Sequence, residues 1–143
     1  MATERRAEVT WRGDLMGGEG TIERVGSGAF GPLDVTWASR AEEPAGRTSP
    51  EELIAAAHAS CFSMALAHGL AQAGNAPEQL AASATITFVP GTGITRSALE
   101  VEATVPGLDE DGFRQAAEEA MDGCPVSQAL KGNVELEVSA RLA

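Results

Sequence analysis

The stretch that decides the fold runs from Ser49 to Gly74 and reads SPEELIAAAHASCFSMALAHGLAQAG. Ser49 suits the N-cap of a helix, Pro50 suits its first position, and Glu52 stands where a capping box needs it. No residue up to Ala73 breaks the helix, and Gly74 suits a C-terminal cap. The sequence therefore predicts one long helix that begins at Pro50.

The predicted helix is apolar over most of its surface. Five residues at positions i, i+4, i+8, i+11 and i+15 form one face: Leu53, Ala57, Cys61, Met64 and His68. Other apolar residues lie elsewhere around the helix, so we expect it to be buried on most sides. A chain of 143 residues has little material to cover such a helix. A second subunit would help, and we therefore expect a homodimer.

Composition narrows the class of protein. The chain is 43% hydrophobic and 22% charged, which is typical of a globular protein, and its formal net charge is −11. Because the chain is acidic, it lacks the basic stripe that neutralises phosphates, and because aromatic residues make up only 4%, it lacks the stacking surface used on single strands. We see no apolar run of membrane-spanning length, and the polar start MATERRAE lacks the core of a secretory signal. We therefore expect a cytoplasmic protein without a nucleic-acid or membrane partner.

The remaining segments predict a single α+β domain over residues 1–143. Alternating residues in EVTWRG, GTIERV and LDVTW, with Gly-rich turns between them, predict an antiparallel meander over residues 6–38. ASRAEEPAGRT is expected to be a polar loop before the long helix. A hairpin follows in AASATITFVP and ITRSALEVEATV, then a helix from Asp109 to about Met121, a short helical piece in CPVSQAL, and a last strand in VELEVSARL. The fold predicted is β-β-β-α-β-β-α-β, with antiparallel strands around a long central helix.

The chain has two cysteines, which are far too few for a secreted disulfide framework. The main chemical question is whether these thiols are core residues, metal ligands or a redox pair. Cys61 lies within the apolar helix, where it is either a small core residue or a reactive thiol. Cys124 precedes Pro125 at a predicted helix N-terminus, where free N–H groups and the helix dipole favour a thiolate. The alternative is that Cys124 only caps the helix.

Three residues of the helix could ligate a metal ion: His58 and Cys61 are spaced i, i+3, and His68 lies on the same side. A closed zinc site takes four ligands in tighter pairs, and the chain has two Cys and two His in all. We therefore predict neither a metal nor another cofactor.

The carboxylate of Glu51 lies in the first helical turn, where the helix dipole favours it in any protein. If Glu52 closes the capping box, Glu51 is free to reach a cation. The candidates are Arg40, Arg47 and Arg24.

The run SPEELIAAAHASCFSMAL, followed by GCPVSQAL, resembles the OsmC/Ohr family of osmotically inducible and organic hydroperoxide resistance proteins. The segments TWRGDLMGGEGTI and VPGLDEDGF fit the same family, and the helix is closer to its OsmC branch. The resemblance implies an OsmC-like fold, in an intertwined homodimer with two sites lined by both chains. It also implies a thiol-dependent peroxidase that reduces organic hydroperoxides to alcohols in oxidative or osmotic stress defence.

By motif match, the resemblance implies that Cys61 is the peroxidatic cysteine and Cys124 the resolving one, which pass through a sulfenic acid to a Cys61–Cys124 disulfide. Glu51 matches the glutamate that orients a catalytic arginine, which the loop before the helix supplies as Arg40, with Arg24 as the fallback. A dithiol reductant, in the family a dihydrolipoyl protein, would reopen the disulfide.

One geometric difficulty follows from the long helix. Ten residues of straight helix place Cys61 about 15 Å beyond Glu51. Either the helix kinks or breaks near Ala59 and Ser60, or the arginine reaches across the gap. Two other functions stay open: a dimer that binds a small lipophilic ligand, and a thiol redox sensor.

Overall fold

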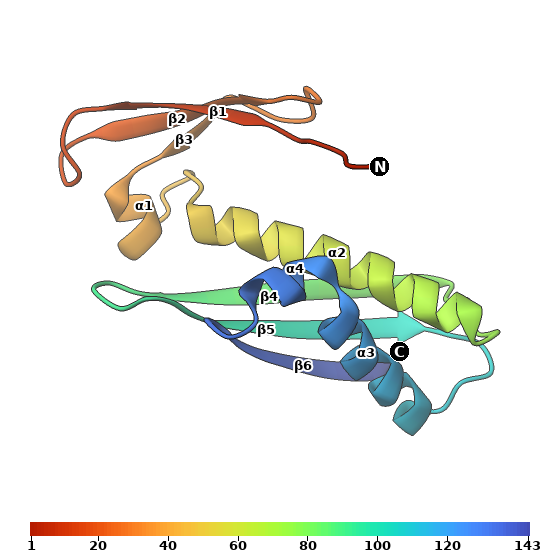
Figure 1. The fold of residues 1–143 in the computed structure, drawn as a ribbon. Coiled ribbons are helices and arrows are strands. Elements are labelled where there is room, and N and C mark those ends of the chain that lie inside the picture. The colour runs from red at the N-terminus through yellow and green to blue at the C-terminus, as the bar shows by residue number, and fades with distance from the viewer. The chain divides into compact units, whose positions relative to one another are not determined.

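The structure is a computed structural model that describes residues 1–143. Its contacts divide the chain into two compact units, residues 1–53 and 54–143, with the boundary inside the long helix α2 (Pro50–Gln72) (Figure 1). The expectation of a single domain stays a prediction. The predicted α+β content is confirmed, since the chain forms two sheets and four helices.

The first unit holds a three-stranded antiparallel sheet of order β1-β2-β3. Its strands are β1 (Ala7–Arg12), β2 (Glu19–Val25) and β3 (Leu33–Val35). These bounds confirm the predicted meander, whose signals are local: alternating side chains and glycine-containing turns.

A short helix, α1 (Trp37–Ala41), lies at the start of the predicted polar loop, so the loop prediction is wrong for residues 38–41 and holds for the residues between α1 and Thr48. The Thr36 hydroxyl accepts a hydrogen bond from the Ser39 amide at 3.0 Å, and the Ser39 hydroxyl accepts one from the Thr36 amide at 2.9 Å. The Ser39 hydroxyl also donates to the carbonyl of Thr48 at 2.8 Å. One helical turn is too short to show helical periodicity, so only this capping pair marks it in the sequence.

Helix α2 begins at Pro50 and ends at Gln72, close to the predicted bounds. The Glu52 amide donates to the Ser49 hydroxyl at 3.1 Å, as expected of a cap, but the capping box is only half formed. The Glu52 carboxylate accepts from the Thr48 hydroxyl at 2.9 Å instead. Gly74 has a φ of +87°, the left-handed conformation that favours glycine after a helix.

The second unit is built on a sheet of order β4-β5-β6. Strands β4 (Gln79–Val89) and β5 (Gly93–Thr104) form the predicted antiparallel hairpin, whereas β6 (Glu135–Leu142) runs parallel to β5. The expectation of purely antiparallel strands is therefore wrong for this pair. Helices α3 (Glu110–Gly123) and α4 (Pro125–Leu130) form a crossover between β5 and β6, which is the connection that parallel neighbours require.

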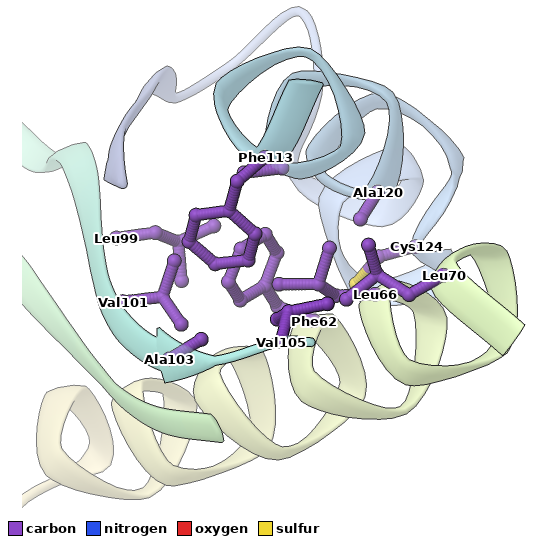
Figure 2. Packing of buried hydrophobic residues seen from close by; sticks show 11 residues of the cluster. Phe62, Leu66, Leu70, Leu99, Val101, Ala103, Val105, Phe113, Ala120 and Cys124 are labelled. Atoms are coloured by element: carbon purple, nitrogen blue, oxygen red, sulfur yellow. The ribbon is translucent and has the colours of Figure 1, made fainter. Parts of the chain in front are cut away.

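The core of the second unit lies between this sheet and the helices, as Figure 2 shows. Alternate residues of β5 point into it, and they meet residues from α2 and α3. Its buried members include Phe62, Leu66, Leu70, Leu99, Val101, Ala103, Phe113, Ala117 and Cys124.

The stripe of α2 that is buried is not the stripe that the sequence predicts. Beyond the first turn, the buried residues of α2 are His58, Phe62, Leu66 and Leu70. On the predicted face, Met64 is 73% exposed, and Ala57 and His68 are exposed as well. Both stripes are apolar and evenly spaced, so periodicity alone cannot choose between them. The expectation of a helix buried on most sides is wrong for the single chain.

Helix α2 is also long and apolar enough, by length and composition alone, to cross a membrane. The prediction that no such segment exists is therefore wrong, because no Asp, Glu, Lys or Arg interrupts the helix after Glu52. The core helix of a globular protein passes the same test. The packing of Phe62 and Leu66 against β5 is the behaviour of a core helix.

Candidate active site

The structure brings Cys61 and Cys124 together as a pair of free thiols whose side chains are hydrogen-bonded to each other. Cys61 lies on α2 beside the buried Phe62, and it is partly exposed. Cys124 is 0% exposed and belongs to the hydrophobic core. The two predicted cysteines therefore differ in access: a solute can reach Cys61 but not Cys124.

Cys124 occupies the junction between two helices. Its amide donates to the carbonyl of Ala120 at 2.9 Å and closes α3, while Cys124 itself is the N-cap residue of α4. Pro125 follows as the first residue of α4, where its missing N–H is no loss. This position confirms the predicted helix N-terminus after Cys124.

The two thiols differ in acidity. Burial raises the pKa of Cys61, and the hydrogen bond with Cys124 raises it further. Burial also opposes ionisation of Cys124, but hydrogen bonds from Cys61, from the Ser127 amide and hydroxyl, and from the Val126 amide outweigh it and lower the pKa of Cys124. The first negative charge of the pair therefore belongs to Cys124, which agrees with the predicted thiolate there. The groups of this second unit do not by themselves provide a Cys61 thiolate.

A buried histidine adjoins the thiol pair. His58 is 0% exposed; its Nδ1 lies 2.6 Å from the Ser97 hydroxyl and its Nε2 lies 2.7 Å from the Ser127 hydroxyl. Burial lowers the pKa of His58, so the ring is neutral at pH 7. Both nitrogens are satisfied without a metal ion, and no group of three or more His, Cys, Asp or Glu is arranged to hold one.

Sequence reasoning missed both serines. Ser127 stands three residues after Cys124 within the motif CPVSQAL, so its place beside the cysteine could have been inferred from helix geometry. Ser97 lies on β5, and no local signal connects it with His58.

The first unit contains an ion pair between two of the predicted site residues. Arg40 at the end of α1 binds Glu51 with Nε at 2.9 Å from Oε1 and Nη2 at 3.0 Å from Oε2. Arg24 instead pairs with Glu8 at 2.8 Å on the exposed sheet. Of the candidate cations, the structure thus pairs Arg40 with Glu51. A two-pronged contact fixes the plane of the guanidinium, which a single contact does not.

The helix that carries Glu51 and Cys61 is continuous from Pro50 to Gln72. A break near Ala59 and Ser60, one of the solutions to the geometric difficulty, is therefore absent. Ten helical residues correspond to about 15 Å along the axis.

An open groove of about 420 Å³ lies between the second half of α2 and α3. The polar groups among its otherwise small or apolar lining residues come from His68, Asn75, Gln115 and Glu119. Neither cysteine lines the groove, so it is separate from the thiol pair.

An α+β protein with two hydrogen-bonded thiols, one of them accessible, has the arrangement expected of a thiol-based redox protein. The model of the OsmC-like protein family matches residues 43–139. Peroxiredoxin OsmC of Escherichia coli (strain K12) is 39% identical over 140 residues, which cover 96% of each chain. Organic hydroperoxide resistance protein-like 2 of Staphylococcus saprophyticus is 29% identical over 93 residues, or 64% of this chain and 66% of that protein.

Solved structures show the same likeness. The crystal structure of the organic hydroperoxide resistance protein OhrB of Bacillus subtilis has a TM-score of 0.68 and 26% sequence identity, covering 95% of this chain and 98% of that one. The chain belongs to the OsmC family, and the family predicted from the cysteine motifs is confirmed.

The neutral, buried His58 predicts a pH dependence of stability. Since burial lowers its pKa in the folded state, the unfolded chain takes up a proton below its ordinary value of 6.5 while the native state does not. The free energy of unfolding therefore falls as the pH drops from 6.5, by up to about 1.4 kcal/mol per pH unit. We expect His58→Gln to remove this part of the slope in urea unfolding measured at several pH values.

His68→Gln is the matched control, because it makes the same change at an exposed histidine of the same helix. An unchanged slope in His58→Gln, or an equal change in both variants, would contradict the assignment.

Proposed function

We propose that the protein is a cysteine-based peroxidase that reduces organic hydroperoxides to alcohols in oxidative stress defence. The observation that carries the proposal is the pair of hydrogen-bonded free thiols, with Cys61 accessible and Cys124 buried. A hydroperoxide can meet only Cys61, so Cys61 is the peroxidatic cysteine and Cys124 the resolving one. The names of the relatives, peroxiredoxin and organic hydroperoxide resistance protein, support the same activity.

The cycle has three steps. The Cys61 thiolate attacks the terminal oxygen of the hydroperoxide; an S–O bond forms, the O–O bond breaks, and the alkoxide takes a proton and leaves as the alcohol. The Cys124 thiolate then attacks the sulfenic sulfur; the S–S bond forms and hydroxide leaves, to be protonated to water. An external dithiol, for which a dihydrolipoyl protein is the candidate, reduces the disulfide and becomes oxidised itself.

The first step requires a cation near Cys61. A thiol with an ordinary pKa of about 8.5 is only a few per cent ionised at pH 7, and burial raises the pKa of Cys61 further. The Arg40 guanidinium, held by Glu51, is the group suited to the task, because it can stabilise both the thiolate and the charge on the leaving oxygen. We therefore assign Arg40 as catalytic and Glu51 as its positioning residue.

Lowering the pKa of Cys61 cannot be the whole contribution of Arg40. A drop from about 8.5 to about 6 gains roughly thirtyfold in thiolate, but nucleophilicity falls with a Brønsted slope of about 0.4–0.5 in disulfide exchange. If peroxide attack behaves similarly, the two effects largely cancel. Holding the peroxide in line and stabilising the leaving oxygen are the larger contributions.

The same helix suggests which chain supplies the arginine. Because α2 is unbroken, Glu51 and Cys61 of one chain are separated by about 15 Å of helix. An intertwined homodimer with two sites, each lined by both chains, removes the difficulty: Arg40 and Glu51 of one chain serve Cys61 of its partner.

The unburied face of α2 supports the homodimer. Only 22% of the most apolar window of this helix is buried within the chain, and Met64 is 73% exposed. An apolar strip without charged side chains needs a cover, and a second copy offers the same strip. The cycle starts and ends with free thiols, so it requires a reducing compartment, for which we propose the cytoplasm.

The peroxidase assignment predicts different defects when each cysteine is replaced by serine. Cys61→Ser should lose more than about a hundredfold in turnover of cumene hydroperoxide with a dithiol present, because the nucleophile is gone. Cys124→Ser should complete one turnover and then accumulate a sulfenic acid, detectable by dimedone labelling and mass spectrometry.

Wild-type protein oxidised without reductant should contain the Cys61–Cys124 disulfide. Equal turnover in wild type and Cys61→Ser would refute the peroxidase. Stoichiometric disulfide formation without turnover would favour a thiol redox sensor, and no reaction with hydroperoxide would favour a dimer that binds a small lipophilic ligand.

The arginine assignment predicts a contrast between two positions. Arg40→Met should lower kcat/KM for the hydroperoxide by about a hundredfold, the usual effect of losing a group that stabilises developing charge. Arg24→Met removes the same charge from the Arg24–Glu8 pair on the exposed sheet and should leave kcat/KM unchanged. The opposite order, or no effect at either position, would overturn this role of Arg40.

The proposed dimer predicts a charge-sensitive face. Met64→Glu places a carboxylate on the exposed strip of α2 and should shift the protein toward the monomer in sedimentation velocity. Met16→Glu is the control, since Met16 is equally exposed at 71% but lies in the first unit, outside the strip. A monomeric wild type would refute the dimer, and dissociation by both variants would refute the strip as its interface.

A further inference from the structure

The buried set His58, Ser97 and Ser127 connects with the resolving cysteine through a single hydroxyl. Ser127 is 1% exposed, and its oxygen lies 2.7 Å from His58 Nε2. The same hydroxyl hydrogen-bonds with Cys124, which stands three residues earlier. Ser97 holds the other ring nitrogen at 2.6 Å. The order of contacts is therefore Ser97, His58, Ser127, Cys124.

The number of protons decides the direction of these hydrogen bonds. A neutral imidazole carries one N–H and a serine hydroxyl carries one O–H. If Ser127 donates to Cys124, its oxygen must accept from His58, so Nε2 carries the ring proton. Nδ1 then accepts from the Ser97 hydroxyl. Every group in the set is satisfied by this arrangement, and each step points a hydrogen toward the sulfur of Cys124.

The opposite arrangement has the opposite effect on the sulfur. With the ring proton on Nδ1, Ser127 would donate to Nε2 and could only accept from Cys124, which favours the thiol. Only the tautomer with the proton on Nε2 leaves the Ser127 hydroxyl free to donate to Cys124, and this is the tautomer that the inference requires.

We propose that His58 is a positioning residue for the resolving cysteine: held by Ser97, it orients the Ser127 hydroxyl as a hydrogen-bond donor toward the buried sulfur of Cys124. The inference rests on the proposed peroxidase cycle. It assigns no proton transfer to His58, which stays neutral throughout. It gives three residues outside the peroxide-reacting centre a part in the second step of the cycle.

A buried resolving cysteine needs hydrogen-bond donors that stabilise its thiolate, because water cannot do so. Cys124 is 0% exposed, so water cannot take its proton at the moment of attack. Once Cys61 is a sulfenic acid, it no longer offers the thiol hydrogen bond that it gives in the reduced protein. The Ser127 hydroxyl remains, together with the amides of Val126 and Ser127. The thiolate can then attack the sulfenic sulfur; the S–S bond forms, the S–O bond breaks, and hydroxide leaves as water after protonation.

The same arrangement serves the reductive step. When an external dithiol attacks the sulfur of Cys61, Cys124 leaves as a thiolate, and a leaving thiol of lower pKa leaves faster. The titratable groups that act on Cys124 are Cys61 directly and His58 through Ser127, both from α2. No charged side chain contributes to the shift in its pKa.

The first test needs no peroxidase activity. In the Cys61→Ser background, Cys124 is the only cysteine, and its pKa can be titrated by thiolate absorbance. Adding Ser127→Ala should raise that pKa by about one unit, the effect of one hydrogen bond to a charged group. Ser63→Ala is the matched control, because the Ser63 hydroxyl donates only to the carbonyl of Ala59, and it should cause no shift.

Two variants of His58 distinguish its role as a hydrogen-bond donor to Ser127 from its role in filling the core. His58→Met removes the N–H donor and should raise the pKa of Cys124, whereas the amide of His58→Gln can replace the donor and should restore it. An unshifted pKa in both Ser127→Ala and His58→Met overturns the inference. If His58→Met does not fold, Ser127→Ala against Ser63→Ala decides the question alone.

The second test resolves the steps of the cycle. With both cysteines present, Ser127→Ala should leave sulfenic acid formation at Cys61 unchanged and slow disulfide formation by up to about tenfold at pH 7. The difference should vanish near pH 10, where Cys124 is ionised in every variant. A defect that is equal at all pH values would indicate a structural role and refute the inference. A wild type that does not react with hydroperoxide would refute the proposed cycle but leave the first test intact.

Discussion

The site in the second unit depends on how α2 is rotated against its sheet. Phe62, Leu66 and Leu70 enter the core between β5 and α3, and Phe62 is 0% exposed. Once this stripe is buried, every other side chain of the helix has its direction set. His58 lies one turn before Phe62 and therefore also enters the core. Cys61, which immediately precedes Phe62, lies at the edge of the core. The contact between the two thiols and the burial of the histidine are thus consequences of apolar packing.

Burial of polar groups then selects their partners. A buried imidazole without hydrogen bonds would cost several kcal/mol, and Ser97 and Ser127 supply both contacts. No buried side-chain nitrogen or oxygen in the chain lacks a partner. The guanidinium of Arg40 is held in a fixed plane by Glu51 in the same way. These satisfied sets are rigid, and rigid placement is what a reactive centre requires.

The two cysteines of the proposed reaction differ in acidity because their surroundings differ. Within the second unit, the hydrogen bonds favour a thiolate at Cys124 and burial disfavours one at Cys61. A nucleophilic Cys61 therefore calls for a cation from elsewhere, and Glu51 stands ten residues before Cys61 on the unbroken helix. The unburied apolar face of α2 suggests the partner that brings both halves together. The acidity of the two thiols and the exposed face of α2 both support the proposed dimer.

Local signals in the sequence determined the elements and the family. Ser49 and Pro50 mark the start of α2, Gly74 marks its end, and the two cysteine motifs identify the OsmC family. Only the tertiary structure decided the rest: the buried stripe of α2, the parallel placement of β6, and the contacts of His58. The reason is physical. Caps and turns are settled by neighbouring residues, whereas a helix that is apolar all round has no preferred face until distant residues such as Leu99 and Ser127 pack against it.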